Sequence, residues 1–339
     1  MGKNFIFISI AVLLAVAVTF FYFENKQDKE VVNVYSSRKE ELVRVLFDEF
    51  TKKTGIKVQY INDEYAPLLT RIENGGKADL LLTADAVNLI LAKKRDLLSS
   101  VDSKILKAAI PEKFRDSQDF WFGLTKRTRI LVYNKELVSV NDLSTYEDLA
   151  NEIWKGKILV RSSTSPYNRS LIAFMIANNG FEKTKDWVQG IVSNMARKPS
   201  GGDTEQILSV AAGEGAVAIV NSYYFARILN SKDEVLKNKL GVFFPNQNDK
   251  GVMVNISGGA VVKNAKNRAN AIALLEFLVS EDAQKLYAEI NQEYPILKNV
   301  EVSNILQSWG HYTQSDLPLS KLEEHMIEAV MLADEYNWK

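Results

Sequence analysis

The chain has 339 residues, of which 46% are hydrophobic and 25% are charged. This length and balance predict a folded protein with room for two domains and argue against general disorder. The chain has 42 basic residues (lysine plus arginine) and 42 acidic residues (aspartate plus glutamate), so its formal net charge is zero. There is thus no excess of positive charge to favour nucleic-acid binding. The sequence has no cysteine, which excludes disulfides, thiolate metal sites and a lipoprotein attachment thiol.

The N-terminal segment differs from the rest of the chain. Lys3 precedes an apolar run over residues 5–23 that contains one serine and one threonine. A positive start before an apolar run is typical of a secretory signal, and Ala15 and Ala17 frame a weak cleavage site. The run is also long enough to span a bilayer. Residues 1–24 are therefore interpreted as either a cleaved signal peptide or a retained N-terminal anchor.

Strand and helix patterns alternate after residue 30. Residues 31–37, 56–61 and 78–85 predict strands, and residues 39–55 and 67–76 predict the two helices between them. The third strand is apolar throughout, as buried parallel strands are. An open α/β sheet of this kind binds ligands beyond the carboxyl ends of its strands. Functional residues are therefore expected in the strand-to-helix turns at 35–41, 82–86, 161–170 and 221–227.

The middle of the chain predicts a second α/β unit inserted into the first. Its expected strands cover residues 157–163 and 215–222, and its helices cover 170–180 and 183–195. Long β-rich stretches at 121–134 and 251–265 flank this unit and are interpreted as paired crossings between two lobes. Helices over 267–290 and 320–336 are expected to pack against the rest.

The predicted fold class is therefore α/β, with two lobes built from interleaved open sheets and joined by hinge crossovers. Lobe 1 is expected to comprise residues 31–126 plus 252–300, and lobe 2 residues 127–251 plus 301–339. Such an architecture is typical of a binding protein that closes on a ligand in its cleft. The architecture alone does not identify the ligand.

Two tyrosines, Tyr223 and Tyr224, stand side by side after the last of these strands. Asn221 and Ser222 are good N-cap residues, so the tyrosines are expected in a first helical turn, where free N–H groups favour negative charge. Phenolate oxygen is a hard anionic ligand that suits ferric iron. From this motif alone, an aromatic wedge that packs the helix onto the sheet remains an alternative.

A series of motifs follows along the chain: YSSR (35–38), LLTADA (81–86), RSSTSPYNRSL (161–171), GGDTEQILSVAAGEGAVAIVNSYYFAR (201–227), FPNQ (244–247), VNISGGAVV (254–262) and NQEYPI (291–296). In order and spacing they resemble the periplasmic ferric-iron-binding proteins of bacterial ABC importers. The resemblance implies a transferrin-like, class II periplasmic solute-binding fold. It also implies a periplasmic monomer, touching the membrane only through an uncleaved N-terminus, that passes Fe(III) to a permease and its ATPase without catalysis.

The resemblance carries site roles onto particular residues. Tyr167, Tyr223 and Tyr224 match the family's tyrosinate ligands. Where many members have a His-Tyr pair, this chain has Lys39 and Glu40. Glu40 is interpreted as a carboxylate ligand. Some members add carbonate or a similar anion to three tyrosines, and Arg38 is expected to hold such an anion, assisted by Lys39.

Further residues are expected to contact the anion or to support the site: Ser37, Asp85, Asp203 and Arg127. Each has a structural alternative. The segment 38–41 also fits a solvated helix start with acidic residues in its first turn. Asp203 also fits a helix cap, and residues 291–295 are expected to form a rigid turn.

Two other functions are alternatives to ferric-iron binding. The arginine, the lysine and the serine-rich turns also suit an oxyanion or organic anion, such as phosphonate or sulfate. Three phenols argue against that ligand, which needs N–H donors. An enzyme is disfavoured, because the sequence has no cysteine nucleophile and no G-x-S-x-G elbow, and its two histidines, His311 and His325, lie outside the cleft turns.

Overall fold

A computed structural model describes residues 30–231 and 234–339. The predicted signal peptide or anchor at residues 1–24 lies outside these ranges. Within the ranges, no helix is long and apolar enough to cross a membrane.

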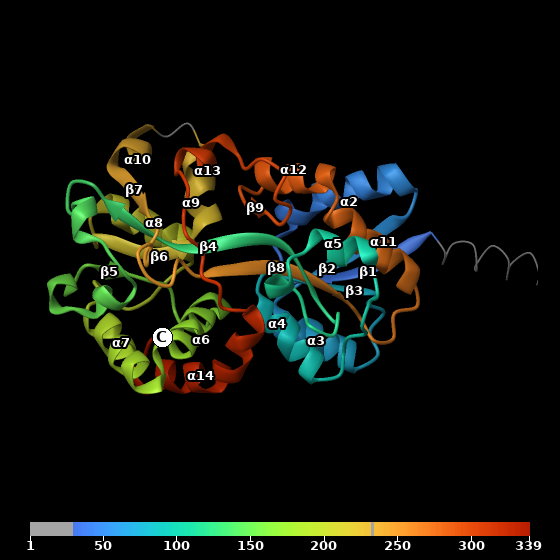
Figure 1. The fold of residues 1–339 in the computed structure, drawn as a ribbon, viewed down its shortest axis with the longest axis horizontal. Helices are drawn as coiled ribbons and strands as arrows, with labels where there is room; N and C mark the ends of the chain where they lie inside the picture. The colour runs from blue at the N-terminus through green and yellow to red at the C-terminus, as the bar shows by residue number, and fades with distance from the viewer. Residues whose placement is uncertain (1–29, 232–233) are drawn as a thin grey trace, which may run out of the picture.

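The described strands join into one curled sheet that runs through both lobes of the molecule (Figure 1). Its main order is β2-β1-β3-β8-β4-β6-β5, and β7 and β9 pair with β4 beside this path. The strands are β1 (Val31–Ser36), β2 (Lys57–Asn62), β3 (Leu80–Thr83), β4 (Phe122–Asn134), β5 (Ile158–Leu159), β6 (Val217–Asn221), β7 (Leu240–Phe243), β8 (Val254–Val261) and β9 (Tyr294–Pro295).

The first half of the sheet follows the predicted β-α-β-α-β order. Strand β1 lies parallel to both β2 and β3, and all four residues of β3 are buried. Helices cover this half, shown at the right of Figure 1. They are α2 (Glu40–Thr54), α3 (Tyr65–Glu73), α4 (Ala86–Lys94), α5 (Lys104–Ala109), α11 (Arg268–Leu278) and α12 (Glu281–Glu289).

The predicted crossings are confirmed as the long strand β4 and its antiparallel partner β8. Residues Phe122 to Thr128 of β4 pair with β8, and from Arg129 onward the same strand pairs with β6. Because one strand belongs to both halves of the sheet, it connects the two lobes directly. Figure 1 shows β4 and β8 running side by side between them.

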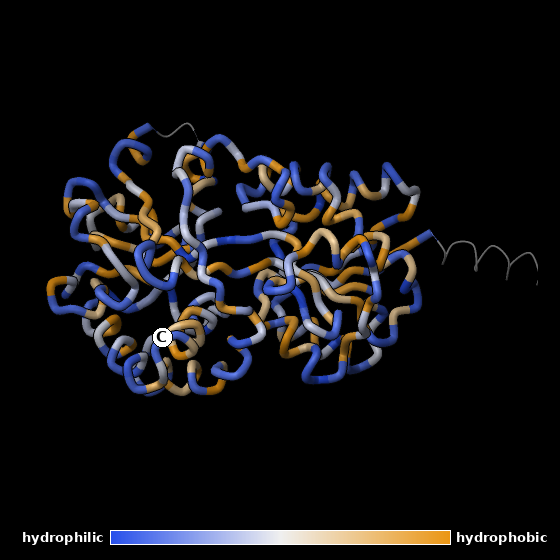
Figure 2. Tube along the Cα trace, in the orientation of Figure 1, coloured by the Kyte–Doolittle hydropathy of each residue, from blue (hydrophilic) through white to orange (hydrophobic). Residues whose placement is uncertain are grey.

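The second half of the sheet contains the inserted α/β unit. Here β6 lies antiparallel to β4 and parallel to β5. Its helices are α6 (Pro166–Asn179), α7 (Phe181–Ser193), α8 (Asp203–Ala212), α9 (Ser222–Leu229), α10 (Glu234–Lys239), α13 (Asn304–Ser308) and α14 (Met326–Glu335). Short 3-10 turns complete the described chain: η1 (Glu112–Phe114), η2 (Val140–Asp142), η3 (Glu147–Ala150), η4 (Glu152–Trp154) and η5 (Leu319–His325). Apolar residues predominate in the strands within each lobe and hydrophilic residues in the outer turns, whereas β4 is hydrophilic where it crosses between the lobes (Figure 2).

Several predicted elements differ from the structure. The helix expected over 170–180 begins earlier, at Pro166, so that Tyr167 lies in its first turn. The expected helix over 267–290 is two helices, because the hydroxyl of Ser280 accepts from the backbone N–H of Ala283 and starts α12 afresh. The expected helix over 320–336 begins as the 3-10 turn η5 and becomes α-helical only at Met326. The strand expected over 157–163 is regular only at Ile158 and Leu159, after which the chain turns toward α6.

Candidate metal centre

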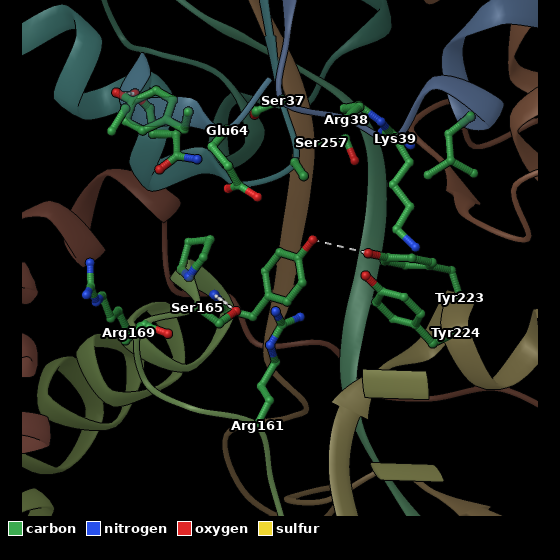
Figure 3. Close-up of a pocket in the computed structure, with 18 of the residues that line it drawn as sticks. Ser37, Arg38, Lys39, Glu64, Arg161, Ser165, Arg169, Tyr223, Tyr224 and Ser257 are labelled. Carbon is green, nitrogen blue, oxygen red and sulfur yellow. Dashed lines mark hydrogen bonds between the residues drawn. The ribbon is translucent and has the colours of Figure 1, made fainter. Parts of the chain in front are cut away.

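A cavity of about 390 Å³ lies between the two halves of the sheet and receives side chains from both. Ser37, Arg38 and Lys39 reach it from the end of β1 and the start of α2 (Figure 3). Tyr223 and Tyr224 face them from α9. The carboxyl ends of strands and the beginnings of helices therefore meet here, which is where an open α/β sheet is expected to bind its ligand.

Tyr223 and Tyr224 lie in the first turn of α9, as predicted. Asn221 precedes the helix but does not cap it with its side chain. Its Oδ1 instead accepts from Nη1 of Arg129 at 3.3 Å. The start of α9 is thus fastened to the crossing strand β4, which fixes where the two phenol rings lie.

Tyr167 occupies the corresponding position at the start of α6. The hydroxyl of Ser165 accepts from the backbone N–H of Tyr167 at 3.3 Å, and Pro166 fills the first helical position. A proline there loses no helical hydrogen bond and has the φ angle that the helix requires. The sequence SPY therefore starts the helix so that the tyrosine projects into the cavity.

The three phenols converge. The hydroxyls of Tyr167 and Tyr223 are 3.3 Å apart, and the dashed line that ends at Tyr223 in Figure 3 marks this contact. The rings of Tyr223 and Tyr224 pack against each other at a tilt, with centroids 4.3 Å apart and planes at 31°. Within the described residues these hydroxyls contact one another and no carboxylate. Such a cluster of oxygens fits a hard cation that takes the place of the phenolic protons.

Burial raises the pKa of Tyr223 well above its usual value, and the neighbouring phenols of Tyr167 and Tyr224 raise it further. Burial likewise raises the pKa of Tyr224, to which Tyr167 and Asp203 add. Both phenols therefore keep their protons at neutral pH when no cation is present. A bound metal ion has to displace these protons, which couples binding to pH.

Two guanidinium groups flank Tyr167. The Cζ atoms of Arg127 and Arg161 each lie 5.2 Å from its ring centroid. Arg161 also pairs with Asp203 at 3.5 Å. Both guanidinium groups are therefore placed to attract the electron-rich face of the ring. The role of Arg161 was missed from the sequence, although its position in the strand-to-helix turn 161–170 was a signal.

Arg38 lies at the cavity, but its guanidinium is already paired. Its Nη2 contacts Glu293 Oε2 at 2.8 Å, and both side chains are almost fully buried. The hydroxyl of Ser257 donates to the other oxygen of Glu293 at 3.1 Å. The Nε and Nη1 atoms of Arg38 and the hydroxyl of Ser37 are buried without a partner in the described chain. These free donors fit a small oxyanion.

Asp85, Arg127 and Asp203 do not line the cavity but lie behind it. Asp85 accepts from Arg127 at 3.2 Å and, across the lobes, from the hydroxyl of Ser170 at 2.9 Å. Burial raises the pKa of Asp85, against the opposing effect of Arg127. Asp203 accepts from Nη1 of Arg129 at 3.0 Å. These buried pairs hold the elements that carry the tyrosines and contribute no free oxygen to the cavity.

Lys39 and Glu40, neighbours in sequence, diverge in the structure. The Lys39 ammonium reaches across the cleft and lies 6.0 Å from the ring centroid of Tyr224. Glu40 is the first residue of α2, and its carboxylate accepts from the hydroxyl of Tyr60 at 2.8 Å, on the exposed surface. Glu40 is not part of the cavity wall. The structure therefore does not bring Glu40 to the three tyrosines.

The curled two-lobed sheet and the cavity between its halves define a solute-binding protein. Residues 35–285 match the family described as bacterial extracellular solute-binding protein, and the chain belongs to that family. It is 42% identical over 318 residues to iron uptake protein A1 of Synechocystis sp., which covers 92% of this chain and 88% of the relative.

Solved structures similar to this chain also include iron-binding proteins. The chain is 43% identical, with a TM-score of 0.86, to a structure described as Trichodesmium IdiA (FutA) in complex with iron and citrate ligands. That match covers 91% of this chain and 100% of the other. The ferric binding protein from Campylobacter jejuni matches with a TM-score of 0.86 and 39% identity, over 90% of this chain and 99% of the other. The predicted fold and family are thereby confirmed.

Proposed function

We propose that this protein binds Fe(III) in the cleft between its lobes and delivers it to the membrane permease and ATPase of an ABC importer. It does so as an exported, periplasmic monomer, without catalysis. The observation that carries the proposal is the convergence of three phenols, with the hydroxyls of Tyr167 and Tyr223 3.3 Å apart. The relatives named above as iron uptake and ferric binding proteins support the same cargo.

Charge explains why the cargo is a trivalent ion. Once deprotonated, Tyr167, Tyr223 and Tyr224 together carry three negative charges, which neutralise Fe(III) within a partly buried cavity. A divalent ion would neutralise only two of the three phenolates, and burial already penalises the charged forms of Tyr223 and Tyr224. The binding oxygens therefore select for charge as well as for hardness.

Closure of the two lobes around the ion belongs to the proposal. We take lobe 1 as residues 31–126 plus 252–300, and lobe 2 as residues 127–251 plus 301–339. Polar contacts that join these parts, such as Asp85 to Ser170 and Glu41 to Arg227, support a closed form. A ligand that binds groups on both lobes shifts the balance toward this form.

The test of the proposal is optical. Titration of the purified protein with Fe(III) nitrilotriacetate is expected to produce a visible phenolate-to-iron charge-transfer band that saturates at one ion per chain. A protein that stays colourless near neutral pH, with and without bicarbonate, would contradict ferric binding.

The alternative ligand is an oxyanion or organic anion such as phosphonate or sulfate. One observation favours it: Arg38 Nε and Nη1 and the hydroxyl of Ser37 are buried donors without partners. Stabilisation of a colourless protein by sulfate or phosphonate in a melting experiment would support this alternative. The same donors also suit carbonate or a similar anion bound beside Fe(III).

Acid is expected to weaken iron binding steeply. Three phenols have to lose their protons on binding, so the logarithm of the affinity should rise by roughly three units per pH unit below the phenol pKa values. The sign follows from the raised pKa values of Tyr223 and Tyr224, which keep the unloaded phenols protonated. Competition against citrate at several pH values, corrected for citrate protonation, measures the slope. A slope near zero would contradict phenolate ligation.

Glu40 is expected to have no part in binding. Its carboxylate is exposed and bonded to Tyr60, outside the cavity. The substitution Glu40→Ala should therefore change Fe(III) affinity by less than about twofold, as surface substitutions usually do. The citrate competition assay measures this affinity. A tenfold lower affinity in Glu40→Ala would show that Glu40 does contribute to iron binding.

A further inference from the structure

Glu64 is a carboxylate of the cavity wall that neither the sequence motifs nor the contacts described so far explain. We propose that Glu64 supplies the carboxylate oxygen by which lobe 1 binds Fe(III), the role that the sequence predicted for Glu40. This inference rests on the proposed function and adds a fourth protein ligand to it. It also identifies how lobe 1 contacts the ion, which the tyrosines alone leave open.

The backbone directs Glu64 into the cleft. It occupies the N-cap position of α3, with φ −59° and ψ 151°, and its side chain does not cap the helix. Glutamate is not among the residues that favour this position. In Figure 3 the Glu64 carboxylate points into the cavity, from the side opposite Arg161 and away from α3. The side chain thus extends into the cleft and makes no capping hydrogen bond that would stabilise α3.

The Glu64 carboxylate is also free. Within residues 30–231 and 234–339 it makes no hydrogen bond or ion pair through its side chain. The other carboxylate of the described cavity wall, Glu293, is engaged by Arg38 at 2.8 Å and by Ser257 at 3.1 Å. Carboxylate oxygen is a hard ligand of the same kind as phenolate. Glu64 is therefore the carboxylate of this wall that is available to a hard cation.

The charge of the loaded site supports a fourth anionic ligand. Three phenolates and Fe(III) sum to zero, so the Lys39 ammonium, 6.0 Å from the Tyr224 ring centroid, would be an unbalanced cation beside them. Arg169, on lobe 2, adds positive charge to the same wall. The Glu64 carboxylate makes the metal complex negative by one, and Lys39 then attracts the complex. Lys39 and Glu64 both extend from lobe 1, so this balance is reached when the cleft closes.

The test compares Glu64→Gln with Glu40→Gln, a matched change of an exposed glutamate outside the cavity. Both unloaded proteins should melt like the wild type, since neither carboxylate is buried. In bicarbonate-free buffer, Glu64→Gln should bind Fe(III) at least about tenfold more weakly, because loss of even an outer-shell partner costs that much. Its phenolate band should persist, but the ferric electron paramagnetic resonance signal should change shape. Glu40→Gln should match the wild type in both measurements.

The outcomes separate this inference from the proposed function. A wild-type protein without a phenolate band contradicts iron binding, and with it the role of Glu64. A wild-type protein with the band, and a Glu64→Gln variant that matches it in affinity and resonance signal, overturns only the role of Glu64. Weaker binding with an unchanged resonance signal also overturns it, because the carboxylate then acts through its charge at a distance. Ligation requires both changes together.

Discussion

Replacement of Tyr223 by phenylalanine is expected to weaken Fe(III) binding by more than about a hundredfold, since loss of an outer-shell partner alone costs 10–100-fold. The phenol of Tyr223 is 5% exposed and lies between the other two, in contact with Tyr167 at 3.3 Å. Phenylalanine keeps the ring that packs on Tyr224 and removes only the oxygen. The loss therefore reports on ligation and leaves the packing intact.

The measurement is a citrate competition titration that follows the visible charge-transfer band. Tyr223→Phe should reduce the band as well as the affinity, because one of its phenolate donors is gone. Tyr60→Phe is the matched control, since the Tyr60 hydroxyl contacts Glu40 on the exposed surface outside the cavity. Equal affinity and absorbance in Tyr223→Phe and the wild type would contradict the tyrosine site.

The second large effect concerns stability: Asp203→Ala is expected to lower the free energy of unfolding by about 3–5 kcal/mol, the usual cost of removing one partner from a buried ion pair. Asp203 is fully buried and accepts from Arg129 at 3.0 Å and from the backbone N–H of Asn221 at 2.7 Å. Without the carboxylate, the Arg129 guanidinium, 1% exposed, loses its charge partner. The N–H at the start of α9 loses its acceptor as well.

Urea unfolding of the unloaded protein measures this loss through the transition midpoint. Asp316→Ala is the control, because Asp316 forms an exposed ion pair with Lys113 and should cause no measurable change. An Asp203→Ala protein as stable as the wild type would contradict this prediction. It would show that water or another acceptor replaces the carboxylate as the partner of Arg129. Iron binding should also weaken in this variant, since the first turn of α9 carries two of the tyrosines.

Local sequence patterns predicted the strand and helix order of this fold better than the ends and breaks of its helices. The alternation of strands and helices in lobe 1 and the crossings β4 and β8 were expected and are confirmed. The break at Ser280 and the 3-10 start before Met326 were not expected. Apolar periodicity continues through both positions, so only the local hydrogen bonds decide where each helix begins.

The sequence by itself determined which helix starts carry the tyrosines. SPY and NSYY place Tyr167, Tyr223 and Tyr224 in first helical turns through short-range effects: a serine cap, a proline at the first position and the end of a buried strand. These effects act over a few residues and can be read from a few letters. The resemblance to ferric-iron-binding proteins then gave the three tyrosines their expected role.

Only the tertiary structure decided which charged groups remain free beside them. Arg38 meets Glu293 across 255 residues of sequence, and Glu40 contacts Tyr60 on the surface. Among the residues that the structure describes, this leaves the Glu64 side chain in the cavity wall without a partner. Whether a charge is neutralised depends on which side chains the fold brings within a few ångströms. Sequence spacing does not encode that distance when the partners come from different elements. The candidate ligands proposed for lobe 2 were therefore predictable, whereas the candidate ligand on lobe 1 emerged only from the packed cavity.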